Sequence, residues 1–164
     1  MISAMIKEIK MASSSLLNVN SDKEIIETIY FGGGTPSLLS VVDLKNILSI
    51  IKNNYSINAE AEITIEANPD DITFEKLAGW KEAGINRLSI GIQSFKEEDL
   101  QWMNRAHNKP QALECIVLAK KAGFTNFSVD LIYGTAALTD DEWKKNVDEV
   151  IKMDAPHIAC YALT

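Results

Sequence analysis

Polar side chains stand where several apolar runs of this sequence end, and their types could hold a small charged ligand. Glu66 follows "EITI", Gln93 follows "LSIGI" and Asp130 follows "FSV". Two carboxylates and an amide can accept hydrogen bonds from an ammonium group and from sugar hydroxyls. A single carboxylate at such a point is equally explained as the cap of a following helix. Three in corresponding positions favour a binding site.

The stretch "YFGGGTPSLLS", residues 30–40, places three glycines between an apolar run and a Thr-Pro pair. It has neither the Gly-Lys-Ser/Thr of a P-loop nor the glycine spacing of a dinucleotide fold. It therefore indicates either a sharp turn or a backbone that approaches a ligand closely. A phosphate at a following helix N-terminus is a further reading, but Glu66 and Asp130 would repel it.

Few other residues could take part in chemistry. Arg105, in "MNRAHN", is a basic residue in the segment after the third expected strand, and an ordinary surface arginine is its plain interpretation. His107 and His157 stand alone in the sequence, so we interpret both as surface or loop histidines without a ligand role. Cys115 and Cys160 are too few for a disulfide framework or a complete metal site, and we expect both to be buried as small apolar side chains.

Apolar periodicity predicts an alternation of helices and strands that would position these residues. Ile2, Met5, Ile6 and Ile9 form one stripe of an amphipathic helix at the start of the chain. Strands are expected at 25–31, 61–68, 87–93, 127–134 and 157–163, and further helices after Ser40, at 74–84, 108–123 and 140–153, with Trp80, Trp102 and Trp143 packing into the core.

An internal repeat sharpens the fold prediction. Residues 81–92, "KEAGINRLSIGI", match residues 120–131, "KKAGFTNFSVDL", in type at nearly every position. Strict strand-helix alternation favours a parallel sheet with outer helices, and a repeated unit favours a barrel over a doubly wound sheet. The open sheet remains the alternative. In both folds ligands bind beyond the carboxyl ends of the strands, where the polar residues described above fall.

The overall composition excludes several classes of protein. A chain of 164 residues with 46% hydrophobic residues suits a single domain, 1–164, with a sizeable core. Its net charge of -7, without a basic run, gives no footprint for nucleic acid or anionic lipid. No apolar run approaches the roughly 20 residues of a membrane span, and the N-terminus lacks the apolar block of a signal peptide. We therefore expect a cytoplasmic protein.

Five segments resemble a known family in their order and spacing. These are "YFGGGTPSLLS", "EITIEANP", "RLSIGIQSF", "NRAHN" and "VDLIYG", and they are similar to the radical S-adenosylmethionine proteins related to oxygen-independent coproporphyrinogen III oxidase. "IEANP", "GIQSF" and "NRAHN" look more like the haem-chaperone branch than the decarboxylase branch. The resemblance implies an α/β fold, an open (β/α)6 TIM-like barrel of which this chain would carry five parallel strands.

The resemblance also implies which residues bind S-adenosylmethionine. Gly33, Gly34 and Thr35 would contact the methionine moiety, and Arg105 would pair with its carboxylate. Glu66, Gln93 and Asp130 would bind the ammonium group and the ribose hydroxyls. Thr164 matches a further binding position only weakly.

The implied function lies in haem or porphyrin metabolism. A haem chaperone would bind haem and S-adenosylmethionine and deliver haem to an acceptor protein. The alternative within the family is oxidative decarboxylation of coproporphyrinogen III to protoporphyrinogen IX. An alternative of another class is a (β/α)-barrel enzyme that binds a phosphate and uses Glu66 or Asp130 as a general base.

One family feature is missing from this sequence, namely the cysteine-rich loop that holds a [4Fe-4S] cluster. The chain begins where the helix after that loop is expected and ends before the family's C-terminal region. We therefore expect a barrel portion without its first strand, which binds no cluster and is inactive alone. The strand at 25–31 would then be an unpaired apolar edge, which predicts self-association.

Overall fold

The computed structural model describes residues 1–17, 25–136 and 138–163. Within them helices and strands alternate, as the periodicity predicts. In chain order the elements are α1 (Ile2–Leu17), β1 (Ile25–Phe31), the 3-10 turn η1 (Pro36–Leu38), α2 (Val41–Asn54), β2 (Ser56–Ala67), η2 (Pro69–Asp71), α3 (Phe74–Ala83), β3 (Arg87–Gln93), α4 (Glu97–Trp102), α5 (Lys109–Lys121), β4 (Phe127–Tyr133), α6 (Asp140–Lys152) and β5 (His157–Ala162).

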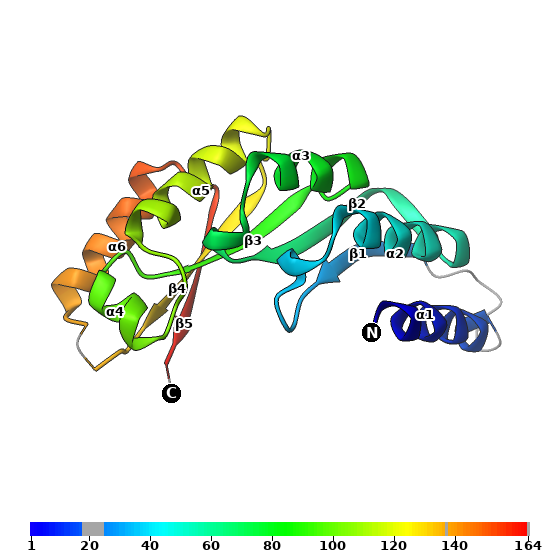
Figure 1. Ribbon diagram of the computed structural model, residues 1–164, viewed down its shortest axis with the longest axis horizontal. Helices are drawn as coiled ribbons and strands as arrows, with labels where there is room; N and C mark the ends of the chain where they lie inside the picture. Colours follow the sequence, from blue (N-terminus) through cyan, green and yellow to red (C-terminus); the bar gives the residue numbers. More distant parts are fainter. Residues whose placement is uncertain (18–24, 137, 164) are drawn as a thin grey trace.

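The five strands form one parallel sheet in the order β1-β2-β3-β4-β5. Every strand lies next to the strand that precedes it in the chain, so the order never reverses as it does in a doubly wound sheet. Helices α2, α3, α5 and α6 lie along one side of the curved sheet and leave the other side open (Figure 1). The prediction of a partial barrel with five parallel strands is confirmed.

Side chains of the central strand alternate between the core and the open face of the sheet. Leu88, Ile90 and Ile92 of β3 are fully buried in the apolar core beneath the helices. Ser89 and Gln93, on the other side of the same strand, line a cavity instead. The period of two along a strand produces both faces from one short sequence.

Helix boundaries follow capping signals in the sequence. The Asn108 side chain accepts the Gln111 N–H at 3.0 Å, and the Gln111 side chain accepts the Asn108 N–H at 2.9 Å, which completes a capping box. Ser40 accepts the Asp43 N–H at 3.0 Å and so caps α2. Gly84 ends α3 in the left-handed conformation, with φ of 105°.

The N-terminal helix α1 packs against the rest of the fold through the expected stripe. Ile2, Met5 and Ile9 contact the apolar core, and the Tyr55 hydroxyl donates to the Ile9 carbonyl at 3.0 Å. Across the described residues, no helix combines the length and apolar character that crossing a bilayer requires.

Some predictions about single elements are wrong. The second strand begins at Ser56 rather than at residue 61, because β1 pairs with its first residues across a register shift. The short helix α4 follows β3, and its Trp102 is 60% exposed rather than part of the core. Cys115 is buried as expected, but Cys160 is exposed because it lies on β5, an edge strand of the sheet.

Candidate functional site

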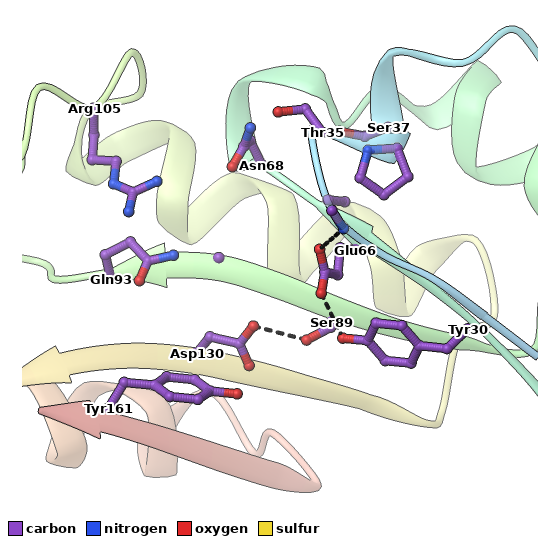
Figure 2. A pocket seen from close by; sticks show the side chains of 14 residues that line it. Tyr30, Thr35, Ser37, Glu66, Asn68, Ser89, Gln93, Arg105, Asp130 and Tyr161 are labelled. Atoms are coloured by element: carbon purple, nitrogen blue, oxygen red, sulfur yellow. Dashed lines mark hydrogen bonds between the residues drawn. The ribbon is translucent and has the colours of Figure 1, made fainter. Parts of the chain in front are cut away.

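A polar cavity of about 450 Å³ opens at the carboxyl ends of the strands. Its volume lies in the range of about 300–1,000 Å³ that is typical of small-molecule sites. Gly34 lies between two lining residues without lining the cavity itself, and Thr164 lies outside the described residues. The other residues predicted from the sequence line the cavity together (Figure 2), namely Gly33, Thr35, Glu66, Gln93, Arg105 and Asp130.

Glu66, near the end of β2, holds the glycine loop in place. Its Oε2 accepts the Gly33 N–H at 3.2 Å, and its Oε1 accepts the Tyr30 hydroxyl at 2.9 Å. Gly33 has φ of 100°, and a Cβ on Gly32 would lie 2.8 Å from the Tyr30 ring. These two glycines are therefore required by a turn and by a close approach. The loop is a sharp turn that also forms one wall of the cavity.

Gln93 leaves the β3 ladder at a β-bulge. Between Ile90 and Gln93 the register with β4 shifts, so that β3 carries one extra residue. Gln93 has φ of 69°, and the Ser94 N–H donates to the Ile92 carbonyl at 2.8 Å, which makes a γ-turn. The turn directs the Gln93 side chain into the cavity, on the same side as Arg105 (Figure 2).

Asp130, in β4, accepts hydrogen bonds from two serines of the open face. The Ser89 Oγ donates to its Oδ2 at 2.7 Å, and the Ser128 Oγ donates to its Oδ1 at 3.3 Å. Burial raises the pKa of Asp130 above its ordinary value, the two hydroxyls lower it, and the Glu66 carboxylate raises it. A carboxylate in this environment is stabilised by a hydrogen-bond donor or a positive charge on a ligand.

Arg105 follows a helix end that fixes its backbone. Asn104 is left-handed with φ of 52° and donates its N–H to the Gln101 carbonyl at 3.0 Å, while the Arg105 N–H donates to the Leu100 carbonyl at 2.9 Å. This is the Schellman arrangement. The Arg105 Nε is buried and has no hydrogen-bond partner among the described residues. Its guanidinium points into the cavity (Figure 2), where its positive charge can pair with a ligand anion.

His107 lies in the loop before α5, as one part of its interpretation expects, but its side chain is buried rather than at the surface. Its side chain is 1% exposed, with Nδ1 at 3.8 Å from the Asp70 carboxylate and Nε2 at 3.0 Å from the Ile92 carbonyl. No periodic pattern surrounds it in the sequence, because its burial depends on how the loop folds after the Schellman turn. His157 is exposed at the start of β5, as expected.

The cavity also contains Asn68, which stands with Glu66 at the end of the second expected strand, and four polar residues that the sequence patterns did not single out, which are Tyr30, Ser37, Ser89 and Tyr161. Strand alternation could have found one of the four, because Ser89 lies on the same face of β3 as Gln93. No comparable signal marks Tyr161, because the cavity reaches β5 only through the curvature of the sheet.

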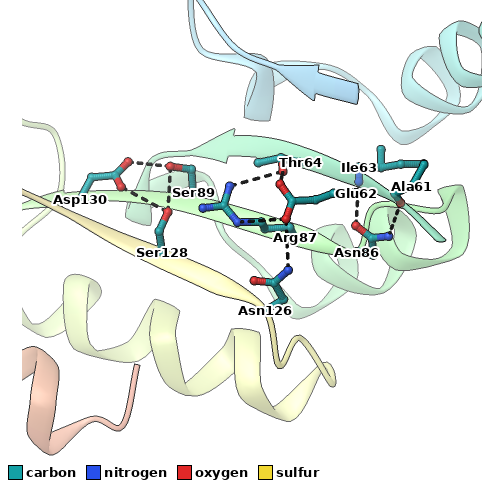
Figure 3. A network of polar contacts seen from close by, with 10 residues as sticks. All are labelled: Ala61, Glu62, Ile63, Thr64, Asn86, Arg87, Ser89, Asn126, Ser128 and Asp130. Carbon is teal, nitrogen blue, oxygen red and sulfur yellow. Dashed lines mark hydrogen bonds and ion pairs between the residues drawn. The ribbon is translucent and has the colours of Figure 1, made fainter. Parts of the chain in front are cut away.

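A second polar network lies on the open face toward the amino ends of the strands (Figure 3). The Arg87 Nε lies 3.7 Å from the Glu62 carboxylate, and its Nη1 lies 3.5 Å from the Thr64 hydroxyl. Asn126 donates to the same carboxylate at 3.5 Å. Because its opposite charges pair with each other, we assign this network to the structure of the sheet rather than to ligand binding.

The cysteines of this chain do not fit an iron–sulfur cluster. Such a cluster needs several thiolates close together. Cys115 is buried in α5, where burial raises the pKa of its thiol to about 12, and Cys160 lies on β5. Among the residues that the structure describes, no three His, Cys, Asp or Glu side chains are grouped to hold a metal ion.

The fold and the site define a class of protein, a parallel α/β half-barrel with a polar small-molecule site at the carboxyl ends of its strands. The family model of the radical SAM superfamily matches residues 16–150. The chain belongs to the radical SAM superfamily, as the five resembling segments predict.

Several known proteins are similar to this chain. The heme chaperone HemW of Lactococcus lactis is 36% identical over 140 residues, which are 85% of this chain and 37% of that protein. HemW of Haemophilus influenzae is 39% identical over 139 residues, which are 85% of this chain and 36% of that protein. The chain thus spans little more than a third of these relatives.

Solved structures share the architecture. The coproporphyrinogen III oxidase of Escherichia coli, described as a radical SAM enzyme, matches with a TM-score of 0.86 at 26% identity, over 99% of this chain and 36% of the other. Elp3 of Methanocaldococcus infernus matches with a TM-score of 0.75 over 96% of this chain and 41% of the other, and at 17% identity it shows a shared fold alone.

Proposed function

We propose that the cavity binds S-adenosylmethionine. The observation that carries this proposal is the unpartnered, buried Nε of Arg105, which shares one cavity with the carboxylates of Glu66 and Asp130. S-Adenosylmethionine has a carboxylate for the guanidinium, and an ammonium, a sulfonium and two ribose hydroxyls for the acidic and amide groups. Membership of the radical SAM superfamily supports the same ligand.

Three polar parts of the ligand have partners in this arrangement, namely the carboxylate, the ammonium group and the ribose hydroxyls. Arg105 pairs with the methionine carboxylate, a charge-assisted hydrogen bond worth about 1.5–3 kcal/mol. Glu66 accepts from the ammonium group, because its carboxylate already lies against the Gly33 loop that contacts the methionine end. Gln93 and Asp130 bind the ribose hydroxyls.

The chemistry of the superfamily also requires an iron–sulfur cluster, which supplies the electron for cleavage of S-adenosylmethionine. The two cysteines of this chain do not fit such a cluster, so no catalytic step is derived from its residues. We therefore propose that these 164 residues bind the ligand without cleaving it.

Calorimetric titration tests the ligand directly, with S-adenosylmethionine and ribose 5-phosphate as separate titrants. Arg105→Met should weaken binding of S-adenosylmethionine at least about tenfold, because it removes one charge-assisted bond. Lys144→Met, the same loss of charge on the exposed side of α6, is the matched control and should leave affinity unchanged. Tight binding of ribose 5-phosphate alone would instead favour the phosphate-binding enzyme.

For the intact protein we propose a haem chaperone, which binds haem and passes it to an acceptor protein. The support is that HemW relatives are 34–39% identical to this chain, against 26% for the solved oxidase. Incubation of the intact, cluster-loaded protein with coproporphyrinogen III separates the two functions. The chaperone should titrate with haem in its absorption spectrum and form no protoporphyrinogen, whereas turnover would identify a decarboxylase.

A cytoplasmic location and a single structural unit over residues 1–164 belong to the same proposal. One continuous apolar core that includes residues of the helices and of the sheet supports the second part. Expression of the chain with a fluorescent fusion tests the first part, and limited proteolysis tests the second.

A further inference from the structure

Gln93 is held in a strained backbone conformation next to the ligand site. Its φ of 69° is rare for a residue with a side chain, and the γ-turn with positive φ is a strained form of this turn. A Cβ on Gly91 would lie 2.6 Å from the side-chain nitrogen Nε2 of Gln93, so the Gln93 side chain folds back over Gly91. Such a conformation persists only where the surrounding structure fixes it.

The carbonyl of Ile92 is the point at which the turn is fixed. It accepts the Ser94 N–H at 2.8 Å within the turn and lies 3.0 Å from the His107 Nε2. A carbonyl oxygen only accepts hydrogen bonds, so Nε2 of His107 carries the proton. Both lone pairs of this oxygen are therefore used, and one of the two donors comes from a distant loop.

His107 is well placed to hold this carbonyl. Its imidazole is 1% exposed, and burial lowers its pKa below the ordinary 6.5, so the ring is neutral at pH 7. The charged groups around it are Asp70 of η2, Glu97 of α4 and Arg105. Because His107 follows Arg105 by two residues, one short segment carries the ligand's cation partner and contacts the turn of Gln93.

We propose that His107 is a positioning residue of the ligand site. Its Nε2 donates a hydrogen bond to the Ile92 carbonyl. This bond keeps the side-chain amide of Gln93 directed into the cavity, beside the guanidinium of Arg105. The role rests on the proposed binding of S-adenosylmethionine, since Gln93 is assigned to that ligand's ribose.

Hydrogen exchange in the ligand-free intact protein tests the first half of this role without any ligand. His107→Leu removes the donor and fills a similar volume with an apolar side chain. It should speed hydrogen exchange of the Ser94 backbone amide by about tenfold, which is the effect of one lost hydrogen bond. His107→Gln can place an amide N–H near the position of Nε2 and should restore most of the protection. Asn86→Ala is the control, because Asn86 bonds Ala61 and Ile63 at the amino ends of the strands, away from the turn.

A double-mutant cycle on S-adenosylmethionine affinity tests the second half. His107→Leu should weaken binding about tenfold, and His107→Gln by less than about threefold. In a Gln93→Ala background, His107→Leu should produce no further loss, because the group that it positions is already gone. Asn86→Ala should change the unfolding midpoint without changing affinity.

The outcomes separate this inference from the proposed function. If the unsubstituted protein binds no S-adenosylmethionine, the proposed function fails. Faster Ser94 exchange in His107→Leu would still support the role of His107 in holding the γ-turn at Gln93. If the unsubstituted protein binds and Gln93→Ala weakens it, unchanged affinity in His107→Leu overturns the positioning role. Losses that add in the double variant overturn it as well, since they would assign His107 to general core packing.

Discussion

At the residue scale, the site keeps a carboxylate in a position that disfavours its charge. Burial and the nearby Glu66 raise the pKa of Asp130, and the hydroxyls of Ser89 and Ser128 only partly oppose this. The folded state therefore favours the protonated form. Stability from this group is fully present below its ordinary pKa of 3.8 and is lost as the pH rises through the raised value. Active sites often retain such groups at the expense of stability.

Asp130→Asn should separate stability from binding. At pH 7 the substitution should raise the free energy of unfolding, because it removes a buried negative charge, and the gain should shrink as the pH falls toward 3.8. Binding of S-adenosylmethionine should weaken about tenfold, since a charge-assisted hydrogen bond is lost. Urea unfolding at several pH values and calorimetry measure the two effects.

The matched control is Asp148→Asn on the exposed side of α6, which should change both quantities little. A lower free energy of unfolding for Asp130→Asn at pH 7 would contradict this account of Asp130.

At the element scale, the segment after β3 is held by polar groups that are themselves buried. The Asp99 carboxylate accepts the Ser94 hydroxyl at 2.9 Å and the Thr135 hydroxyl at 3.0 Å. Asn146 of α6 accepts the Phe95 N–H at 2.9 Å and donates to the Ser94 hydroxyl at 3.0 Å. This network joins the loop after β3, the loop after β4 and α6. The chain directly after Gln93 is thus held by several buried hydrogen bonds.

Asn146→Leu should lower the free energy of unfolding by about 2–3 kcal/mol, because it leaves the buried Phe95 N–H without its partner. Asn53→Leu makes the same change at an exposed position of α2 and should stay within about 0.5 kcal/mol. Urea unfolding followed by circular dichroism compares the two variants. Equal effects would mean that the buried network contributes little to stability.

At the scale of the whole molecule, the sheet ends in two edge strands, β1 and β5. Among the described residues no strand pairs with the outer edge of β1, where Ile25 and Tyr30 are 61% and 56% exposed. An unprotected apolar edge can pair with another chain. The self-association expected from the sequence therefore stays a prediction for the 164-residue chain.

Sedimentation velocity over a range of concentrations measures this association. Ile25→Lys should shift the chain toward the monomer, because lysine on an edge strand opposes edge-to-edge pairing. Val42→Lys, at an exposed apolar position on α2, should leave the association unchanged. A clean monomer of the unsubstituted chain at high micromolar concentration would contradict the prediction.

Much of this architecture was predictable because it depends on local, periodic signals. The bounds of β1 and β3 agree with the apolar runs at 25–31 and 87–93. Helix α4 was missed because six residues are too few for a periodic signal. The first part of β2 was missed because its exposed, polar alternation resembles a loop.

The sequence by itself determined the family, the alternation of helices with parallel strands and the types of group that meet at the strand ends, because these follow from residue type and spacing along the chain. The tertiary structure alone decided how those groups are oriented. Glu66 accepts a hydrogen bond from the glycine loop, and His107 is buried against Ile92, so both contacts join segments distant in sequence. The burial of the unpartnered Arg105 Nε is likewise decided by the fold. Such contacts depend on the curvature of the sheet and on single strained turns, for which the sequence carries no periodic signal.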